Sequence, residues 1–474
     1  MGALSRRVLI AVHLAGMVLL ASCGQADVAV AKVDGGRLGM VSLLTPDNAS
    51  GTYPVVLIVE KADESSNLHA RQIAAAGHSV IVLDWSVASA AASAANEPCH
   101  FLVGDLEGFI QQTQTKLAYP KYVPPVVIGI GEGADAAYAL LAQAPSLAIA
   151  GAIGIGRTGK LQVKGSFCNE VSEVRLDQAA ETYGPKEDTN GWWRSVVDSS
   201  EVAEIDFAKA SSGGTAKHPN TVIVTKQADQ TERIEAALAA ASSIVSKDAT
   251  APLVDLPLTP LKSDKPSDVL AIIISGDGGW RDLDRQIGYE LVTRDISVVG
   301  VDSLHYFWQT KSPQQIANDL TRIIDYYGKA WGTKHVVLIG YSFGADIMPS
   351  AVDHLSAETR ASIVQISLLG MSDVADYEIH VSGWLGVQPK GEPLEPDAAK
   401  LDMARVQCFY GKQEEVTFCT SSTMKPAEVY GLSGGHHFDG DYTKLADLIV
   451  SGLKKRLAGS AANSSLTELP IVQQ

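Results

Sequence analysis

The chain has 474 residues and a formal net charge of −16. Hydrophobic residues make up 46% and charged residues 19%, which is typical of globular proteins, and the length favours two domains with separate cores. The negative charge argues against nucleic acid and an anionic membrane face as direct partners, because both would repel the surface.

The N-terminus has the pattern of an export signal. Arg6 and Arg7 precede an apolar run, residues 8–20, that is too short for a comfortable membrane span. Leu-Ala-Ser-Cys then resembles a bacterial lipobox, in which residues 1–23 form the signal segment and Cys23 carries lipid. The alternative is ordinary cleavage after Ala31. Both interpretations place the mature protein outside the cytoplasm, and lipidation would anchor it to a membrane.

The cysteines fit an oxidising compartment. Five are present, and four remain if Cys23 is lipidated, an even number suited to two disulfides. We expect Cys408 to pair with Cys419 because both lie near one loop after a predicted strand. Cys99 and Cys168 pair by elimination. No CxxC or HxxxH spacing supports a metal site.

The first half alternates buried strands with helices. Continuous apolar runs indicate strands buried on both faces of a parallel sheet. We expect strands at 55–59, 80–83 and 126–128, and helices at 68–76 and 102–117. This alternation predicts an α/β domain over residues 36–246.

The second half repeats this plan after a proline-containing segment, residues 247–267, that we interpret as a linker. A second α/β domain is expected over residues 268–458, followed by a flexible tail, residues 459–474. Its expected strands are 269–274, 296–301 and 336–339, and its expected helices are 283–292 and 313–327.

A G-x-S-x-G motif follows the strand at 336–339. Four β-forming residues run into Gly340-Tyr341-Ser342-Phe343-Gly344, and a helix-compatible segment comes next. This strand–elbow–helix context predicts Ser342 as a nucleophile, with the Phe343 N–H as one donor of an oxyanion hole. The alternative is an ordinary strand–helix turn.

The first half carries a similar segment. Residues 128–135, Ile-Gly-Ile-Gly-Glu-Gly-Ala-Asp, align with residues 339–346, and Gly131 occupies the place of Ser342. Residues 71–73 and 285–287 are both Arg-Gln-Ile and occupy corresponding positions. We infer a duplication in which the N-terminal copy is degenerate and not catalytic, with convergent α/β patterning as the alternative.

A serine nucleophile needs a base and an acid that orients it, and in α/β-hydrolases these follow in the order Ser, Asp or Glu, His. The expected strand 406–410 leads into a turn that carries Glu414. We predict Glu414 as the acid, with Glu415 and then Asp373 as alternatives. A solvated acidic loop remains the other interpretation.

The histidine candidates follow the last expected strand, residues 427–432. Gly434 and Gly435 precede His436 and His437, and small residues let this loop approach the nucleophile. We prefer His436 as the base, with His437 as the alternative. A structural role for both is the remaining possibility.

A glycine-rich loop, Ser-Gly-Asp-Gly-Gly-Trp, follows the first strand of the second domain at residues 275–280. Hydrolases draw the second oxyanion N–H from this position, and we predict Asp277 as its donor. A phosphate cradle is the alternative, but the loop lacks the Lys-Ser/Thr of a P-loop. Tyr306 to Trp308 either wall a substrate pocket or pack in the core.

Four segments together resemble the AcvB/VirJ family of bacterial virulence proteins. The full length, with a degenerate first copy, is similar to the AcvB type, whereas the shorter VirJ type would match only from about residue 265. The segments are 275–284, 306–308, 340–346 and 434–442.

This resemblance implies a periplasmic protein. AcvB-type members hydrolyse aminoacylated phosphatidylglycerol, such as lysyl-phosphatidylglycerol, and VirJ-type members are linked to type IV secretion. The resemblance implies Ser342 as nucleophile and one histidine of the 436–437 pair as base, while Glu414 stands where we expect an aspartate. For substrate binding, the candidates are Asp277, Trp280, Tyr306, Trp308 and Asp346, with Asp282 and Asp284 as further partners for an ammonium group.

We therefore expect two tandem α/β-hydrolase-like domains, the second acting as a serine esterase on lysyl- or alanyl-phosphatidylglycerol without cofactor or metal. The alternatives are an esterase or lipase of other specificity, and a non-enzymatic periplasmic factor that binds type IV secretion components.

Overall fold

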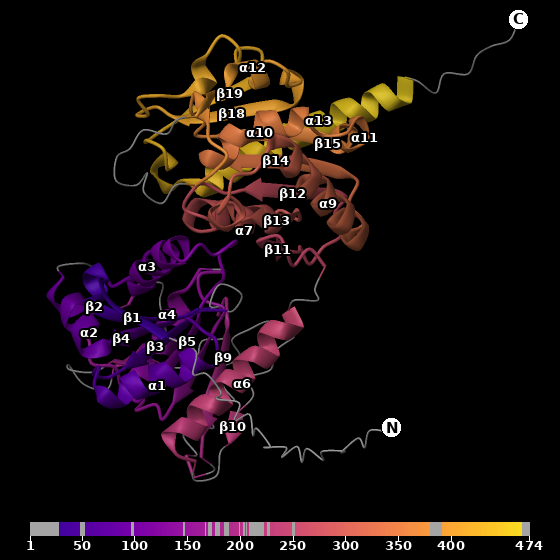
Figure 1. Ribbon diagram of the computed structural model, residues 1–474. Coiled ribbons are helices and arrows are strands. Elements are labelled where there is room, and N and C mark those ends of the chain that lie inside the picture. Colours follow the sequence, from indigo (N-terminus) through magenta and orange to yellow (C-terminus); the bar gives the residue numbers. More distant parts are fainter. Residues whose placement is uncertain are drawn as a thin grey trace, which may run out of the picture.

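The computed structural model describes residues 28–47, 53–95, 99–145, 147–165, 228–248, 252–379 and 391–466, with short segments between 167 and 224. The short segments are 167–168, 173–175, 181–183, 189–198, 200–201, 204, 206–207 and 222–224. Cys23 and the predicted signal lie outside these residues. The chain forms two α/β bodies, one after the other (Figure 1). Within the described ranges, no helix combines the length and apolar character needed to cross a bilayer.

The first body is built on a sheet whose described part has eight strands in the order β1-β2-β4-β3-β5-β6-β9-β10. Antiparallel pairing joins β1 to β2 and β2 to β4, and the remaining neighbours are parallel. The strands are β1 (Val28–Asp34), β2 (Met40–Pro46), β3 (Val55–Val59), β4 (Val80–Asp84), β5 (Val126–Ile130), β6 (Gly151–Ile155), β9 (Trp192–Val197) and β10 (Val222–Val224). The helices are α1 (Glu64–Ala75), α2 (Trp85–Ala94), α3 (Leu102–Lys116), α4 (Glu132–Gln143) and α6 (Gln230–Asp248).

The second body has a described sheet of seven strands in the order β11-β13-β12-β14-β15-β18-β19. Only β11 runs antiparallel to its neighbour in this described sheet. The strands are β11 (Leu258–Leu261), β12 (Val269–Ile274), β13 (Ser297–Val301), β14 (His335–Tyr341), β15 (Ile363–Leu369), β18 (Val406–Gly411) and β19 (Glu428–Leu432). The helices are α7 (Asp282–Val292), α8 (Ser303–Tyr306), α9 (Pro313–Trp331), α10 (Phe343–Asp353), α11 (Ala357–Ser362), α12 (Glu395–Ala398) and α13 (Tyr442–Leu466).

The two sheets match strand for strand. The order β2-β4-β3-β5-β6-β9-β10 corresponds to β11-β13-β12-β14-β15-β18-β19, including the antiparallel strand at one side. Buried residues of α9 and α10 cover one face of the second sheet, and those of α7 and α13 cover the other. Ile73 and Ile287, from the matching Arg-Gln-Ile segments, are both fully buried. The predicted fold class, two tandem α/β-hydrolase-like domains, is confirmed.

Two domain boundaries and one strand differ from the sequence predictions. The first sheet begins at Val28, ahead of residue 36, and α13 continues to Leu466, beyond residue 458. Within the expected linker, residues 258–261 form β11 because they pair with β13 at the sheet edge, where the missing N–H of Pro260 is tolerated.

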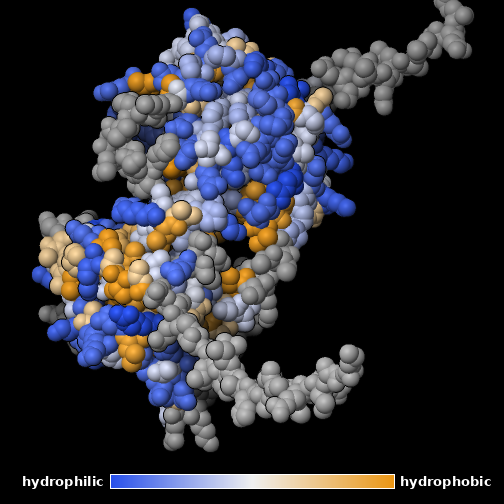
Figure 2. All heavy atoms as spheres, viewed as in Figure 1, coloured by the Kyte–Doolittle hydropathy of each residue, from blue (hydrophilic) through white to orange (hydrophobic). Residues whose placement is uncertain are grey.

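The two domains differ in the surface that they show in Figure 2. On this face, hydrophilic residues cover much of the second domain, and hydrophobic residues are more frequent on the first.

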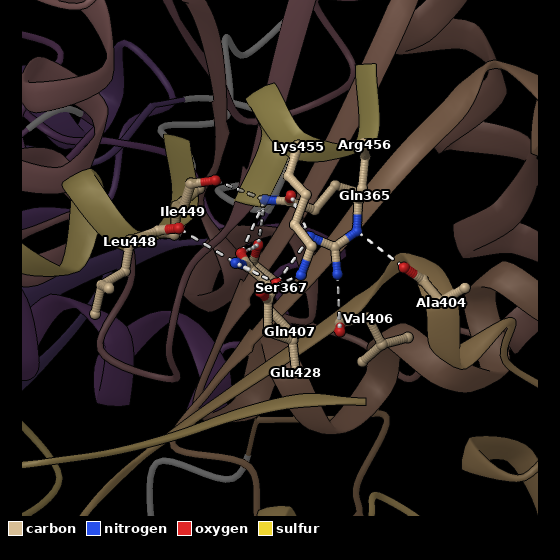
Figure 3. A network of polar contacts seen from close by, with 10 residues as sticks. All are labelled: Gln365, Ser367, Ala404, Val406, Gln407, Glu428, Leu448, Ile449, Lys455 and Arg456. Atoms are coloured by element: carbon tan, nitrogen blue, oxygen red, sulfur yellow. Dashed lines mark hydrogen bonds and ion pairs between the residues drawn. The ribbon is translucent and has the colours of Figure 1, made fainter. Parts of the chain in front are cut away.

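A buried polar network fixes α13 against the strands that lead to the predicted acid and histidine (Figure 3). The Gln407 amide oxygen on β18 accepts from Gln365 Nε2 at 2.9 Å and from Ser367 Oγ at 3.1 Å. Gln407 Nε2 donates to Glu428 Oε2 at 3.1 Å, and Arg456 Nη1 of α13 donates to the same oxygen at 3.0 Å. Because Gln365, Ser367 and Gln407 are fully buried, losing one of them leaves buried donors or acceptors of the others unsatisfied.

Replacing Gln407 with leucine should lower the free energy of unfolding by about 2 kcal/mol, because buried donors and acceptors lose their partners. The thermal transition should fall by roughly 4–8 °C, measured by circular dichroism or calorimetry. Gln286→Leu, at an exposed position on α7, is the control and should shift it little. Equal shifts in both variants would contradict a stabilising role for the network.

Candidate active site

Ser342 lies at a sharp turn between β14 and α10. Its backbone has φ 50° and ψ −118°, a region that a serine rarely adopts. Two glycines make this turn possible through close packing: a Cβ on Gly340 would lie 2.4 Å from the Gly344 carbonyl oxygen, and one on Gly344 would lie 2.1 Å from the Ile274 oxygen. The turn therefore packs directly against the end of β12, and Ser342 follows the carboxyl end of β14.

Ser342, His436 and Glu414 form a continuous hydrogen-bonded line. His436 Nε2 lies 2.8 Å from Ser342 Oγ, and His436 Nδ1 lies 2.6 Å from Glu414 Oε1. The second oxygen of Glu414 accepts from the Gly411 N–H at 2.6 Å, and this side chain is only 9% exposed. With the proton on Nδ1 directed at the carboxylate, Nε2 is left to accept the serine proton.

The alternative residues lie elsewhere. Glu415 and Asp373 are exposed, and His437 is exposed with its Nδ1 3.2 Å from the Tyr341 hydroxyl. Of the two histidines and three acids considered, the structure brings His436 and Glu414 together with the serine. The histidine loop comes close because of glycine: a Cβ on Gly411 would lie 2.1 Å from the Gly435 oxygen.

The glycine-rich loop after β12 borders the serine. A Cβ on Gly276 would lie 3.6 Å from Ser342 Cβ, so the Gly276–Asp277 backbone is beside the nucleophile, while Asp277 is exposed. Reciprocal hydrogen bonds hold the start of this loop, with Ser303 N donating to Ser275 Oγ at 2.9 Å and Ser303 Oγ donating to Ser275 O at 2.6 Å.

Phe343 carries the other N–H predicted as an oxyanion donor. As the first residue of α10, it has an N–H with no partner in the preceding helical turn, at the positive end of the helix dipole. The loop after β12 and the start of α10 thus both border the serine hydroxyl. This arrangement suits nucleophilic attack on a carbonyl and stabilisation of the resulting oxyanion.

Both predicted disulfides, Cys99–Cys168 and Cys408–Cys419, are formed. Cys408 lies on β18, so the second bridge ties that strand to the segment after Glu414. Among the described residues, no group of three or more His, Cys, Asp or Glu side chains is placed to hold a metal ion.

Two aromatic residues expected to contact substrate are core residues instead. Trp280 is 2% exposed and packs on Gly300, where a Cβ would lie 2.5 Å from its ring. Tyr306 is also buried, and its hydroxyl donates to Asp319 at 2.7 Å. Both side chains therefore fill space in the core of the second domain and have a packing role.

Trp308, the third expected aromatic, lies against the core of the first domain. The aromatic ring next to the nucleophile turn belongs to Phe307, fully buried with its centroid 4.8 Å from that of Phe343. The sequence does not single out Phe307 from Tyr306 to Trp308, because three successive aromatic residues carry no indication of which one lies next to the nucleophile turn.

Asp346, the last substrate-binding candidate, is anchored within the protein. Its carboxylate accepts from Ser372 N at 2.8 Å and from Ser372 Oγ at 2.9 Å. Burial raises the pKa of Asp346 to about 7, against the opposing effects of the Ser372 hydrogen bonds and the nearby His436. Asp284 is buried at 3% exposure, and the Asp282 side chain lies outside the described residues.

Residues 268–457 match the family described as "Bacterial virulence protein (VirJ)". The resemblance drawn from the four motifs is thereby confirmed, and the domain that carries the triad is VirJ-like.

The chain is also similar to several solved structures. Est1E from Butyrivibrio proteoclasticus is 16% identical with a TM-score of 0.32, covering 42% of this chain and 93% of that one. MenH from S. aureus is 12% identical with a TM-score of 0.33, covering 42% and 98%. The esterase EaEST from Exiguobacterium antarcticum is 13% identical with a TM-score of 0.32, covering 42% and 95%. No curated protein matches the chain.

The geometry predicts that Glu414 activates Ser342 through His436. Glu414→Gln should slow labelling of Ser342 by a fluorophosphonate about 100-fold or more, because the amide favours the wrong imidazole tautomer. Glu415→Gln, at the exposed neighbouring position, is the matched control and should label at the wild-type rate. Labelling can be followed by intact-protein mass spectrometry. Equal rates for the two variants would remove Glu414 from the triad.

Proposed function

We propose that the second domain is a serine esterase that hydrolyses the aminoacyl ester of aminoacyl-phosphatidylglycerol, releasing an amino acid and phosphatidylglycerol. The observation that carries the proposal is the line of hydrogen bonds from Glu414 through His436 to Ser342. The choice of substrate class comes from the resemblance of the full chain to AcvB-type proteins, and the VirJ match covers the domain that carries this line of residues.

The reaction follows from this geometry. Ser342 Oγ attacks the ester carbonyl carbon while His436 Nε2 takes the serine proton, and the Phe343 and Asp277 N–H groups stabilise the oxyanion. The bond to the glycerol oxygen then breaks, and His436 returns the proton to that oxygen, releasing phosphatidylglycerol. Water, deprotonated by His436, attacks the aminoacyl-serine ester and frees the amino acid and Ser342.

The charge of the protein is consistent with a cationic acyl group. The chain has a formal net charge of −16, and the exposed Asp277 lies on the loop beside Ser342. We assign to the Asp277 carboxylate the role of meeting the ammonium of the aminoacyl group. In contrast, the anchored carboxylate of Asp346 is engaged with Ser372.

The location that suits this substrate is the periplasmic face of a membrane. The disulfides indicate a protein outside the cytoplasm. A lipid on Cys23 would hold an acidic enzyme beside an anionic surface that otherwise repels it.

Cys23→Ser should move the protein from the membrane fraction to the soluble periplasm. The reason is that the acyl chain on Cys23 is the proposed membrane anchor, and serine cannot carry it. Fractionation followed by immunoblotting measures the distribution. Unchanged membrane association would count against lipidation at this residue.

The proposal is tested by incubating purified protein lacking residues 1–23 with lysyl- and alanyl-phosphatidylglycerol in mixed micelles. Mass spectrometry should show conversion of one or both lipids to phosphatidylglycerol and free amino acid. Ser342→Ala should reduce the rate at least about 1,000-fold. If folded wild-type protein leaves both lipids intact, the function lies with another ester or with non-enzymatic binding of secretion components.

A further inference from the structure

An ion pair joins the two domains at the loop beside the nucleophile. Arg281 Nη2, immediately before α7, lies 2.9 Å from Glu107 Oε2 of α3 in the first domain. The Glu107 side chain is 4% exposed and that of Arg281 is 27% exposed. Figure 1 shows α3 facing the end of the second domain that carries α7. A carboxylate so deeply buried depends on its partner cation, because it has little access to water.

Aromatic contacts form the second part of this junction. The Tyr122 ring of the first domain lies 4.4 Å from the His305 ring and 5.5 Å from the Trp308 ring, measured between centroids. Trp308 Nε1 donates to the Tyr119 carbonyl oxygen at 3.1 Å, and its ring packs against the core of the first domain. Trp308 therefore acts as an anchor between domains.

Both contacts are made by segments that position the oxyanion loop. From Gly276 a tight turn runs to Arg281, with Gly279 N donating to Gly276 O at 3.1 Å and Arg281 N donating to Gly279 O at 2.9 Å. His305 belongs to α8, whose first residue, Ser303, makes the reciprocal hydrogen bonds to Ser275. Movement of Arg281 or α8 would thus reach the Gly276–Asp277 backbone beside Ser342.

We propose that the first domain, which lacks the nucleophile, positions the oxyanion loop of the second, and that Glu107 is the positioning residue through its ion pair with Arg281. This inference rests on the proposed esterase function. Three glycines, at 276, 278 and 279, leave the loop with little rigidity of its own. An oxyanion hole works through donors held in place before the reaction, so a contact from outside the loop has a direct effect on the chemical step.

The test compares Glu107→Gln with Asp105→Asn in the mature chain, using p-nitrophenyl acetate and lysyl-phosphatidylglycerol as substrates. Asp105 lies on the same helix and pairs with Arg37 at 2.8 Å within the first domain, so it is a matched control. Glu107→Gln should lower kcat about tenfold with less than about a twofold change in KM. Asp105→Asn should behave as wild type. Arg281→Gln should lower kcat at least as much as Glu107→Gln, because it leaves the buried carboxylate without its cation, and the double variant should be no worse than Arg281→Gln.

Hydrogen exchange of the 275–284 peptide gives a readout independent of activity. It should accelerate in Glu107→Gln and remain at the wild-type rate in Asp105→Asn. Wild-type kcat and wild-type exchange in Glu107→Gln would overturn the inference, as would equal acceleration in the control. If wild-type protein cleaves the nitrophenyl ester but not the lipid, only the substrate class fails. If it cleaves neither, the proposed function fails, and the exchange comparison alone decides whether Glu107 holds the loop.

Discussion

The constraint on which the site depends is the close packing of the nucleophile turn on β12. Gly340 and Gly344 leave no room for side chains, since a Cβ on either would lie within 2.4 Å of a backbone oxygen. This packing places Ser342 at φ 50°, a strained conformation that the surrounding strands and α10 maintain. The Ser342 hydroxyl thereby faces His436 Nε2, and the first N–H of α10, that of Phe343, follows directly in the chain. Every other functional group is arranged around that fixed point.

The parallel sheet brings the remaining groups to this point. Because β12, β13, β14, β18 and β19 all run in one direction, the loops that leave their carboxyl ends meet at one edge. Those loops carry the glycine-rich turn, Ser303, Ser342, Glu414 and His436. The network of Gln365, Gln407 and Arg456 joins α13 to β15 and β18 (Figure 3). It thereby holds β18, the strand that leads to the loop with Glu414. Strand order and a buried polar network together determine where three distant side chains meet.

Local sequence was sufficient to predict strands β3, β4, β5, β12, β13, β14, β18 and β19, the nucleophile turn, the chain order of the triad residues and both disulfides. Most of these depend on short-range patterns: apolar runs, glycine at fixed offsets, and Cys408 and Cys419 near one loop, whereas the Cys99–Cys168 pair followed by elimination. It was insufficient for Trp280, Tyr306 and Trp308, since the same aromatic residue serves a pocket, a core or a domain junction according to tertiary packing alone. The short strand β11 was missed because prolines obscured an edge pairing that depends on β13. The contact of Phe307 with Phe343 and the anchoring of Asp346 by Ser372 likewise join residues that are far apart in the sequence.

The first domain shows what the fold retains when the nucleophile is absent. Gly131 has φ 61°, the counterpart of Ser342 at φ 50°, so the same turn exists without strain because glycine tolerates this conformation. Asp135 accepts from Thr158 N at 2.9 Å and Oγ1 at 2.8 Å, just as Asp346 accepts from Ser372 N and Oγ. Glu132 occupies the place of Phe343. Its carboxylate accepts from Trp85 Nε1 at 3.1 Å and from the Gln162 N–H at 2.6 Å, so it is hydrogen-bonded within the first domain. The first copy has therefore kept the packing of the turn, and internal hydrogen bonds take the place of the reactive group, which agrees with the positioning role that we propose for this domain.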